Sequence, residues 1–331
     1  MANDLRAALT HVKAQVQSRL PVDVDDLARQ VGHHWRERKL TPSVTIWLFM
    51  LQILNGNIAM TALNHLGAMV MQASSYCAAR ARLPMELFTR LFDEVSRAAG
   101  VQAAFSGQGL LNGRRVLLAD ATCFSMPDTP ALRKHFFYPP GQEEGCGFPM
   151  SRLLGVVDAM TGAFMVATAC PLFSHEAREA LSLHPLLRRG DVLVADRAFC
   201  SYAQIALLLH HGVDVVMHLH QRRTTRVLRD AIETWKRPGK CPDWMSTLLW
   251  QLLSETLSVR IVRYTVARKG YRTRVVYVAT TLLDVNAYPT ETIMRLYGHR
   301  WQIEIFHPYC LHCHSFDKFD GQGLGHFRSA A

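Results

Sequence analysis

Two kinds of segment are missing from this 331-residue sequence: a long apolar run and a basic leader followed by an apolar stretch. A membrane-spanning helix needs about 20 predominantly apolar residues. The longest nearly uncharged stretches, residues 43–56 and 60–77, are interrupted by amide and histidine side chains. The first residues, MANDLRAALTHVKAQ, contain acids and amides where a secretory signal has a basic and then an apolar region. We therefore expect neither a transmembrane helix nor export.

Glycine, proline and cysteine are few or scattered. The 20 Gly and 14 Pro are too few for a collagenous or low-complexity chain. The eight Cys lack the dense spacing of a secreted disulfide framework, so reduced thiols in the cytoplasm fit better. Only Cys310 and Cys313, with His307, His312 and His314 around them, approach the spacing of zinc ligands. No second ligand pair matches them, so a structural zinc site rests on this segment alone.

The chain is rich in apolar side chains and in arginine. With 49% apolar and 19% charged residues, it is expected to fold rather than to remain disordered. The 37 Lys and Arg against 27 Asp and Glu give a formal net charge of +10, which is typical of a protein with a polyanionic partner. Basic residues cluster at 29–39, 222–229 and 260–274. One such cluster can simply solvate a surface, but the three together favour nucleic acid.

The first hundred residues have apolar side chains at three- and four-residue steps, which predicts a helical domain over residues 1–100. Ser43 and Ser75 are placed as helix N-caps, and Gly56 and Gly100 as helix ends.

A polar stretch of this helical region contains Arg36, Arg38 and Lys39. We predict that these three side chains face DNA phosphates, with a solvated helix end as the alternative.

After residue 113 the pattern changes from helical to strand-like. Short apolar runs predict strands, and two stretches among them predict helices, in the order β-β-β-α-β-α-β: residues 115–119, 152–158, 163–170, 175–187, 191–195, 202–211 and 213–219. This is the element order of the ribonuclease H-like fold, a mixed sheet with helices on its faces. The predicted class is therefore α/β (α+β), with the ribonuclease H-like domain over residues 101–306.

Residues 221–285 differ in composition from the flanking sequence. A basic segment containing three tryptophans is followed by two alternating runs, residues 257–267 and 272–280. We interpret this region as a β-rich insertion into the domain. Helical periodicity returns after Pro289 and continues through Phe306.

Two aspartates each follow a strong apolar run: Asp120 in LLADAT and Asp196 in LVADRAF. If the two strands are neighbours, both carboxylates emerge at one sheet edge, where open α/β sheets bind ligands. Carboxylates brought close together repel, and Mg²⁺ with its oxygen ligands relieves that repulsion. The last helix offers a third carboxylate, because Tyr297, Arg300 and Glu304 share one face at i, i+3 and i+7. An exposed Arg–Glu ion pair is the alternative for this helix.

Together these motifs resemble the DDE-type transposases of bacterial insertion sequences, in the group with a Tyr-x2-Arg-x3-Glu-x6-Lys helix. The motifs are Asp120, the ADRAF segment at 195–199, the TTLLD segment at 280–284 with Tyr288-Pro289, and the Tyr297/Arg300/Glu304 spacing. The resemblance covers roughly residues 33–306. It implies DNA cleavage and strand transfer, with double-stranded DNA as the partner: terminal inverted repeats and target DNA. It places the protein in the bacterial cytoplasm at the nucleoid and leaves a homodimer open.

The resemblance also implies roles for individual residues. Asp120, Asp196 and Glu304 would be the catalytic, metal-binding triad, with Mg²⁺ as cofactor and Mn²⁺ as its substitute. Tyr297 and Arg300 would hold a phosphate near the cleaved end.

Four further residues are weaker candidates for DNA contacts. In relatives the insertion assists a cleavage in which a flipped base stacks on an aromatic ring, and Trp235, Trp244 and Trp250 are candidates here. A tryptophan in a β-rich segment is more often part of the core. Arg197 follows the second aspartate and either serves the same strand end or forms a structural ion pair.

The C-terminal end departs from the family pattern. The family's lysine falls at position 311, where this chain has Leu311, and residues 307–331 lose helical periodicity. A shifted reading frame or a truncated element would explain this tail and make its His/Cys cluster accidental; a genuine alternative terminus with metal ligands is the other interpretation. Two rival functions follow: a catalytically impaired transposase remnant that still binds DNA, and a hydrolytic nuclease of the same fold without strand transfer.

Overall fold

The computed structural model describes most of the chain and divides it into two compact units. The described residues are 20–36, 38–66, 71–105, 110–111, 113–143, 145–172, 176–221, 223, 230–266 and 274–311. One unit contains Met1–Ala99, Phe124–Met150 and Phe306–Ser329; the other contains Gly100–Cys123 and Ser151–Ile305. Among the described residues, no helix is both long enough and apolar enough to cross a membrane.

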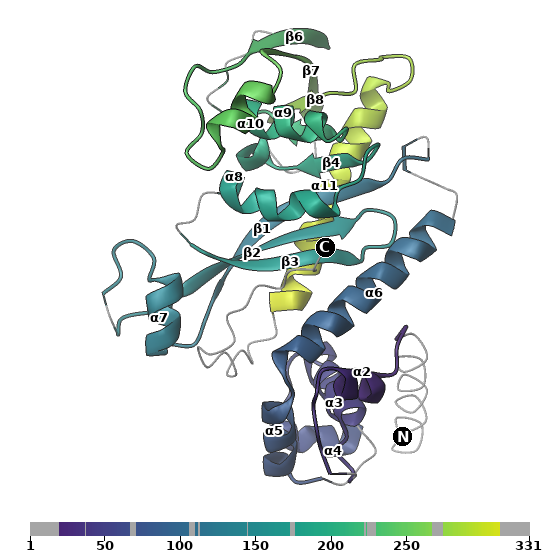
Figure 1. The fold of residues 1–331 in the computed structure, drawn as a ribbon, viewed down its shortest axis with the longest axis vertical. Coiled ribbons are helices and arrows are strands. Elements are labelled where there is room, and N and C mark those ends of the chain that lie inside the picture. The colour runs from purple at the N-terminus through teal and green to yellow at the C-terminus, as the bar shows by residue number, and fades with distance from the viewer. Residues whose placement is uncertain are drawn as a thin grey trace. The chain divides into compact units, whose positions relative to one another are not determined.

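Among the described residues up to Ala99, the secondary structure of the first unit is helical, as the periodicity predicts (Figure 1). Its helices are α2 (Val24–Gln30), α3 (Pro42–Leu54), a 3-10 turn (Met60–Ala62) with α4 (Leu63–Leu66), α5 (Ala73–Arg82) and the start of α6 (Met85–Phe105). Two small apolar cores hold these helices together, one around Leu27, Ile46 and Leu87, the other around Leu48 and Tyr76. The same unit contains α7 (Pro130–Phe136).

The helix boundaries correct three details of the sequence prediction. Thr41 caps α3 by accepting a hydrogen bond from a backbone N–H of the first turn, and Pro42 follows it, so Ser43 lies inside the helix. Ser75 lies inside α5, and Gly100 inside α6. One glycine costs a helix only about 1 kcal/mol, which the packing of a long amphipathic helix offsets. Gly56 does follow the end of α3, with a φ of 72°.

The second unit is built on an eight-stranded sheet of the order β3-β2-β1-β4-β5-β8-β7-β6 among the described residues. The first five strands are β1 (Val116–Ser125), β2 (Met150–Asp158), β3 (Phe164–Pro171), β4 (Val192–Ala195) and β5 (Asp214–His218). β1, β4 and β5 are parallel, whereas β2 and β3 are antiparallel. The connecting helices are α8 (Glu176–Glu179) with a 3-10 helix (Ala180–Leu186), and α9 (Tyr202–His210). The predicted mixed α/β (α+β) sheet is therefore confirmed, and the strands follow in the predicted order, with a helix between β1 and β2, α7, that was not predicted.

The β-rich segment extends this sheet. It consists of β6 (Ala231–Lys236), α10 (Thr247–Leu252), β7 (Thr256–Val266) and β8 (Arg274–Thr280), and β8 pairs antiparallel with β5. The short helix α10 was not expected from the sequence. The turn that joins the two alternating runs lies outside the described residues.

Helices cover both faces of the sheet. Because successive side chains of a strand point to opposite faces, each strand contributes to two separate hydrophobic cores. Leu117 of β1 packs with α9 on one face. Leu118 packs with α11 (Thr290–Leu311) on the other. Figure 1 shows α9 and α11 on opposite sides of the strands. Helix α11 continues five residues past Phe306, because extending a helix that is already formed costs little.

Arg260 on β7 anchors the beginning of α11. Its side chain is 0% exposed, pairs with Asp230, and donates to the Tyr288 carbonyl at 2.6 Å and to the Thr290 hydroxyl at 3.3 Å. The Arg260 guanidinium holds the pKa of the Asp230 carboxyl below its usual value. This arginine, which belongs to the third basic cluster of the sequence, is therefore used inside the protein and is not on a DNA-facing surface.

Candidate active site

Three polar side chains lie in one row across the parallel strands. In the β1–β4 register, Ala119 is opposite Ala195, so the residues that follow them, Asp120 and Asp196, are neighbours. The 76-residue separation of the aspartates equals the offset of this register. The β4–β5 register places His218 next in line. We call Asp120, Asp196 and His218 the polar row.

The polar row faces α11. Leu118, Val194 and Val216 lie two residues earlier on the three strands and belong to the core that contains Tyr297 of α11. Because strand side chains alternate between faces, the residues of the polar row point to the same face as these three. Tertiary structure therefore brings the strand ends and the α11 motif together.

Asp120 meets Arg300. The Arg300 Nη1 lies 3.5 Å from the Asp120 Oδ2, and the two side chains are only 8% and 14% exposed. The other carboxylate oxygen, Oδ1, accepts a hydrogen bond of 2.9 Å from the Ala121 N–H. Contacts to both oxygens limit rotation of this carboxylate.

Asp196 meets His218, with 3.7 Å between the His218 Nδ1 and the Asp196 Oδ1. The pKa of Asp196 is lowered to about 2, first by its interaction with His218, and further by the Arg197 backbone N–H and the Arg300 charge; burial acts in the opposite direction. Asp196 is therefore ionised at neutral pH. The sequence analysis missed His218, although it ends the apolar run VVMH at the position where the other two runs end in aspartate.

Tyr297 fills the space between these pairs. Its side chain is 4% exposed, its ring centroid lies 5.9 Å from that of His218, and the Arg300 guanidinium lies 5.6 Å from its ring centroid. Burial raises the pKa of the Tyr297 hydroxyl, which keeps its proton at neutral pH. The structure thus brings together Asp120, Asp196, Tyr297 and Arg300.

The remaining residues of the predicted site are placed less completely. Glu304 lies on α11 one turn after Arg300, but its side chain is outside the described set, as are those of Leu311 and the His/Cys segment. Arg197 is exposed in a 3-10 turn (Arg197–Phe199) that begins directly after Asp196.

The donor chemistry of the polar row fits a hard divalent cation. Asp120 and Asp196 offer carboxylate oxygens at adjacent strand ends, and such oxygens are preferred by Mg²⁺. Within the part of the chain that the structure describes, no group of three or more His, Cys, Asp or Glu side chains is arranged to hold a metal ion. Glu304, whose side chain is not described, belongs to α11, the helix that the polar row faces.

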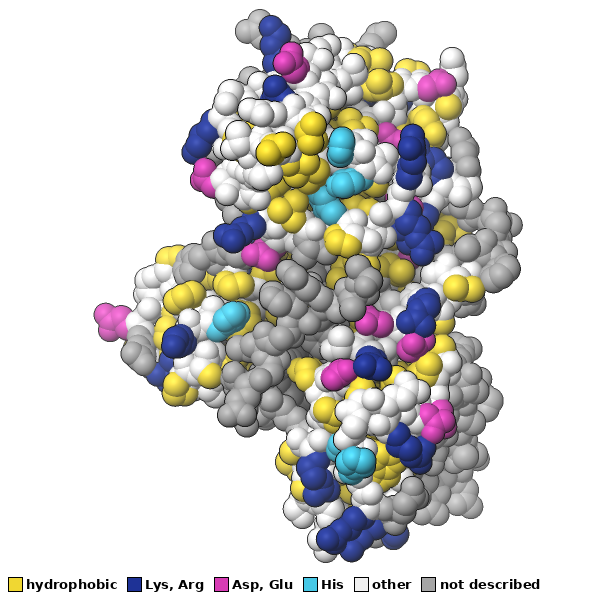
Figure 2. Space-filling model, viewed as in Figure 1, with side chains coloured by type: hydrophobic (Ala, Val, Ile, Leu, Met, Phe, Trp, Pro, Cys, Tyr) yellow, Lys and Arg dark blue, Asp and Glu magenta, His cyan; other side chains and the backbone are white. Residues whose placement is uncertain are grey.

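Arg36, Arg38 and Lys39 are exposed on the helical unit and line a cavity of about 1000 Å³. Arg82 of α5 lines the same cavity, as does the ring of Trp35. Figure 2 shows Lys and Arg side chains on the surface of both units, with several close together on the helical one. A cavity with several cationic side chains is suited to a polyanion.

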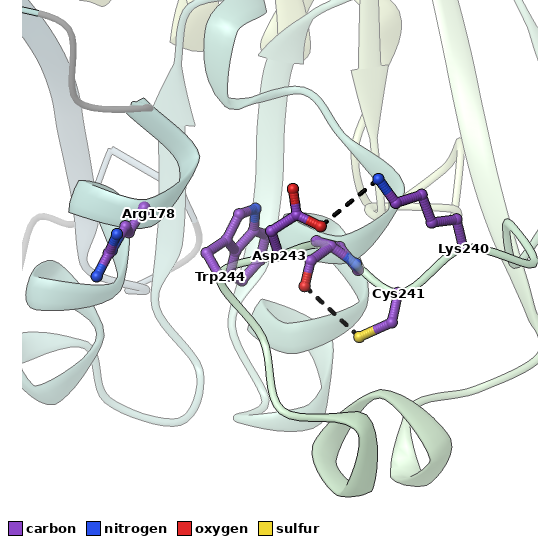
Figure 3. Close-up of a pocket in the computed structure, with 6 residues that line it drawn as sticks. Arg178, Lys240, Cys241, Asp243 and Trp244 are labelled. Carbon is purple, nitrogen blue, oxygen red and sulfur yellow. Dashed lines mark hydrogen bonds and ion pairs between the residues drawn. The ribbon is translucent and has the colours of Figure 1, made fainter.

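The three tryptophans of the β-rich segment differ in burial. Trp235 and Trp250 are 4% and 6% exposed and belong to the core on the α9 face of the sheet. Trp244 is half-buried and lines a cavity of about 340 Å³ together with Arg178 and Lys240 (Figure 3). Burial thus favours the core interpretation for two of the three and leaves Trp244 accessible.

Comparison with known proteins agrees with this geometry. A family model described as the transposase DDE domain matches residues 111–328, which is more than half of the chain and includes the whole polar row and α11. No curated protein matches the chain. The domain is ribonuclease H-like, and the family implies DNA as the partner and divalent metal ions for the chemistry. The chain therefore belongs to the DDE transposase family.

Proposed function

We propose that this protein catalyses metal-dependent DNA cleavage and strand transfer at the ends of an insertion sequence. The observation that carries the proposal is the polar row. In it, two aspartates that are 76 residues apart in the sequence lie on neighbouring strands and face Tyr297 and Arg300 on α11. Double-stranded DNA is the substrate, as terminal inverted repeats and as target. We also propose that the protein forms a homodimer and associates with the nucleoid.

Asp120, Asp196 and Glu304 are proposed to hold the divalent cations, Mg²⁺ or Mn²⁺ in its place. When bound, the cations activate the attacking hydroxyl and neutralise charge on the leaving oxygen of an in-line displacement. The low pKa of Asp196 supports this role, because the carboxylate is ready to bind a cation without first losing a proton.

Arg300 and Tyr297 are proposed to position the scissile phosphate. Arg300 supplies charged N–H donors, and Tyr297 supplies a neutral O–H donor, whose pKa burial raises further above neutrality. Arg300 already lies against Asp120, so a phosphate bound by Arg300 lies beside a carboxylate that holds a cation. Arg197, exposed beside Asp196, is proposed as a further phosphate contact.

Other DNA contacts are proposed outside this centre. The cavity lined by Arg36, Arg38 and Lys39 binds the DNA backbone. Trp244 is our candidate for stacking on a displaced base, since its ring reaches a cavity flanked by two cationic side chains.

One observation favours a second function. Leu311 ends α11 where the family has lysine, and a transposase lacking that cation could bind DNA without cutting it. A cleavage assay separates the alternatives. A labelled duplex that carries the element's terminal repeat is incubated with Mg²⁺ or Mn²⁺ and a target plasmid. We expect metal-dependent nicking and joined product with the wild type, no cleavage with Asp120→Ala, and full cleavage with Asp26→Ala, an exposed aspartate of α2. Binding without nicking would establish the impaired remnant, and nicking without joining would establish a nuclease.

A further inference from the structure

His218 is the member of the polar row to which the proposed chemistry gives no role. It occupies on β5 the position that Asp120 and Asp196 occupy on β1 and β4. Each aspartate has its own nitrogen partner, Arg300 for Asp120 and His218 for Asp196. Each of the two carboxylates is therefore contacted by a nitrogen-bearing side chain from a different element of the fold.

The chemistry of the contact defines the role of the imidazole. A carboxylate only accepts hydrogen bonds, so His218 can complement Asp196 only when Nδ1, which lies 3.7 Å from the Asp196 Oδ1, carries the hydrogen. The ring also lies beside Tyr297, with 5.9 Å between centroids and 47° between planes. His218 is thus placed between Asp196 and a buried aromatic ring, and its own side chain is 20% exposed.

The carboxylate of Asp196 is less constrained by its surroundings than that of Asp120. It comes directly after Ala195, the last residue of β4, and its side chain is 35% exposed, against 14% for Asp120. Asp120 lies within β1, which continues to Ser125, and Arg300 contacts its carboxylate from across the face.

We propose that His218 is a positioning residue: its Nδ1–H fixes the orientation of the Asp196 carboxylate and so the geometry in which Asp196 binds a divalent cation. This inference rests on the proposed function, since it assumes that Asp196 is a metal ligand. Partners that orient metal ligands typically contribute tenfold to a hundredfold to metal affinity.

Binding of Mn²⁺ to the full chain tests the proposal. The matched pair is His218→Asn, whose amide N–H takes the place of Nδ1–H, and His218→Leu, which has a similar volume but no donor. We expect Mn²⁺ affinity, measured by calorimetry and by electron paramagnetic resonance, to fall about tenfold to a hundredfold in H218L and to stay near wild type in H218N. The thermal unfolding midpoint should be the same in both. His210→Ala, at an exposed histidine of α9, serves as the control and should leave affinity unchanged.

The outcomes are distinct. Asp196→Ala should lose Mn²⁺ affinity; if it does and H218L binds like the wild type, the positioning role is wrong and the proposed function stands. If D196A binds Mn²⁺ like the wild type, the proposed function itself is wrong. Equal losses in H218N and H218L, or a nitrogen coupled directly to Mn²⁺ in the wild type and absent from H218L, would also overturn the proposal. If H218L does not fold, His218→Gln replaces it, because its amide lies one bond further out and leaves the Nδ1 position without a donor.

Discussion

Two arginine–aspartate contacts lie at α11, one beside its first turn and one on the helix itself. They differ in their length and in the acceptors around the arginine. Arg260 at the beginning of the helix is 0% exposed and is bound by Asp230, two backbone carbonyls and the Thr290 hydroxyl. Arg300, in the middle of the helix, approaches Asp120 at 3.5 Å. The first guanidinium is surrounded by protein acceptors, whereas the second lies beside a carboxylate that we propose binds metal.

This difference separates structural from functional use of the same residue types. A buried arginine with many fixed acceptors holds segments together, here Asp230, the TTLLD turn and the start of α11. An arginine that lies 3.5 Å from an aspartate at a strand end is placed to bind a ligand beside that carboxylate. We therefore expect stability to depend on Arg260 and catalysis on Arg300.

Removing Arg260 is expected to have the largest effect. Arg260→Met leaves the Asp230 carboxylate without its main partner, and breaking a buried ion pair typically costs about 3–5 kcal/mol. Urea unfolding of R260M should show this loss of free energy. The double variant Arg260→Met, Asp230→Asn should recover part of it, because the uncompensated charge is gone. An R260M protein as stable as the wild type would contradict the structural role of this contact.

The same substitution at Arg300 should mainly reduce cleavage and have a smaller effect on stability. Arg300→Met should lower cleavage by about a hundredfold to a thousandfold, the usual loss for one electrostatic contact to the reacting group. Its free energy of unfolding should change by less than in R260M, since the Arg300–Asp120 contact of 3.5 Å is longer than the contacts of Arg260 with Asp230 and the Tyr288 carbonyl. Cleavage rates and urea unfolding of the two variants, measured side by side, check the comparison. Strong destabilisation of R300M with normal cleavage per folded molecule would refute it.

Much of the site was predictable from sequence because strand ends are marked by local pattern. The apolar runs before Asp120 and Asp196 predict strands that end at a common edge, and the i, i+3 spacing of Tyr297 and Arg300 predicts their common face. The structure brings these four residues together. The role of Glu304 remains a prediction, which rests on that spacing and on the family resemblance, because its side chain is outside the described residues.

Long-range pairing explains what was missed. The pairing of β8 with β5 links segments about sixty residues apart, and no local pattern reports it. Arg260 looked like part of a basic cluster because its partner, Asp230, is 30 residues away. The sequence does not mark His218 as part of the site, because a histidine at the end of an apolar strand is also common in a core and its partner, Asp196, is on another strand. The burial of Trp235 and Trp250 likewise depends on tertiary packing.

A histidine on the α9 face of the sheet predicts how the stability of the protein depends on pH. His184 lies against Gln204 and His211, and burial lowers its pKa from 6.5 to about 4. Between these two values His184 binds more protons in the unfolded chain than in the folded one, so its contribution to stability should fall as the pH drops from about 6.5 to 4 and change no further below that, by at most about 3 kcal/mol. Urea unfolding across this range should show a smaller decline in His184→Gln, whereas His210→Gln, at an exposed histidine, should keep the wild-type decline. Equal declines in wild type and H184Q would show that His184 is not buried neutral.

The smallest effects are expected from exposed cations on the helical unit. Arg36→Ala, Arg38→Ala and Lys39→Ala should each weaken binding of a labelled duplex by about fivefold to tenfold near 0.1 M salt, and each should reduce the salt slope by about 1. The control is Arg97→Ala, whose side chain is 64% exposed and pairs with Glu94 on α6, outside this cavity. These variants should leave the free energy of unfolding near wild type, because exposed charges contribute little to stability. If R97A reduces the salt slope as much as R36A does, the cavity has no special part in binding, and the distinction between structural and ligand-binding arginines would then apply at α11 alone.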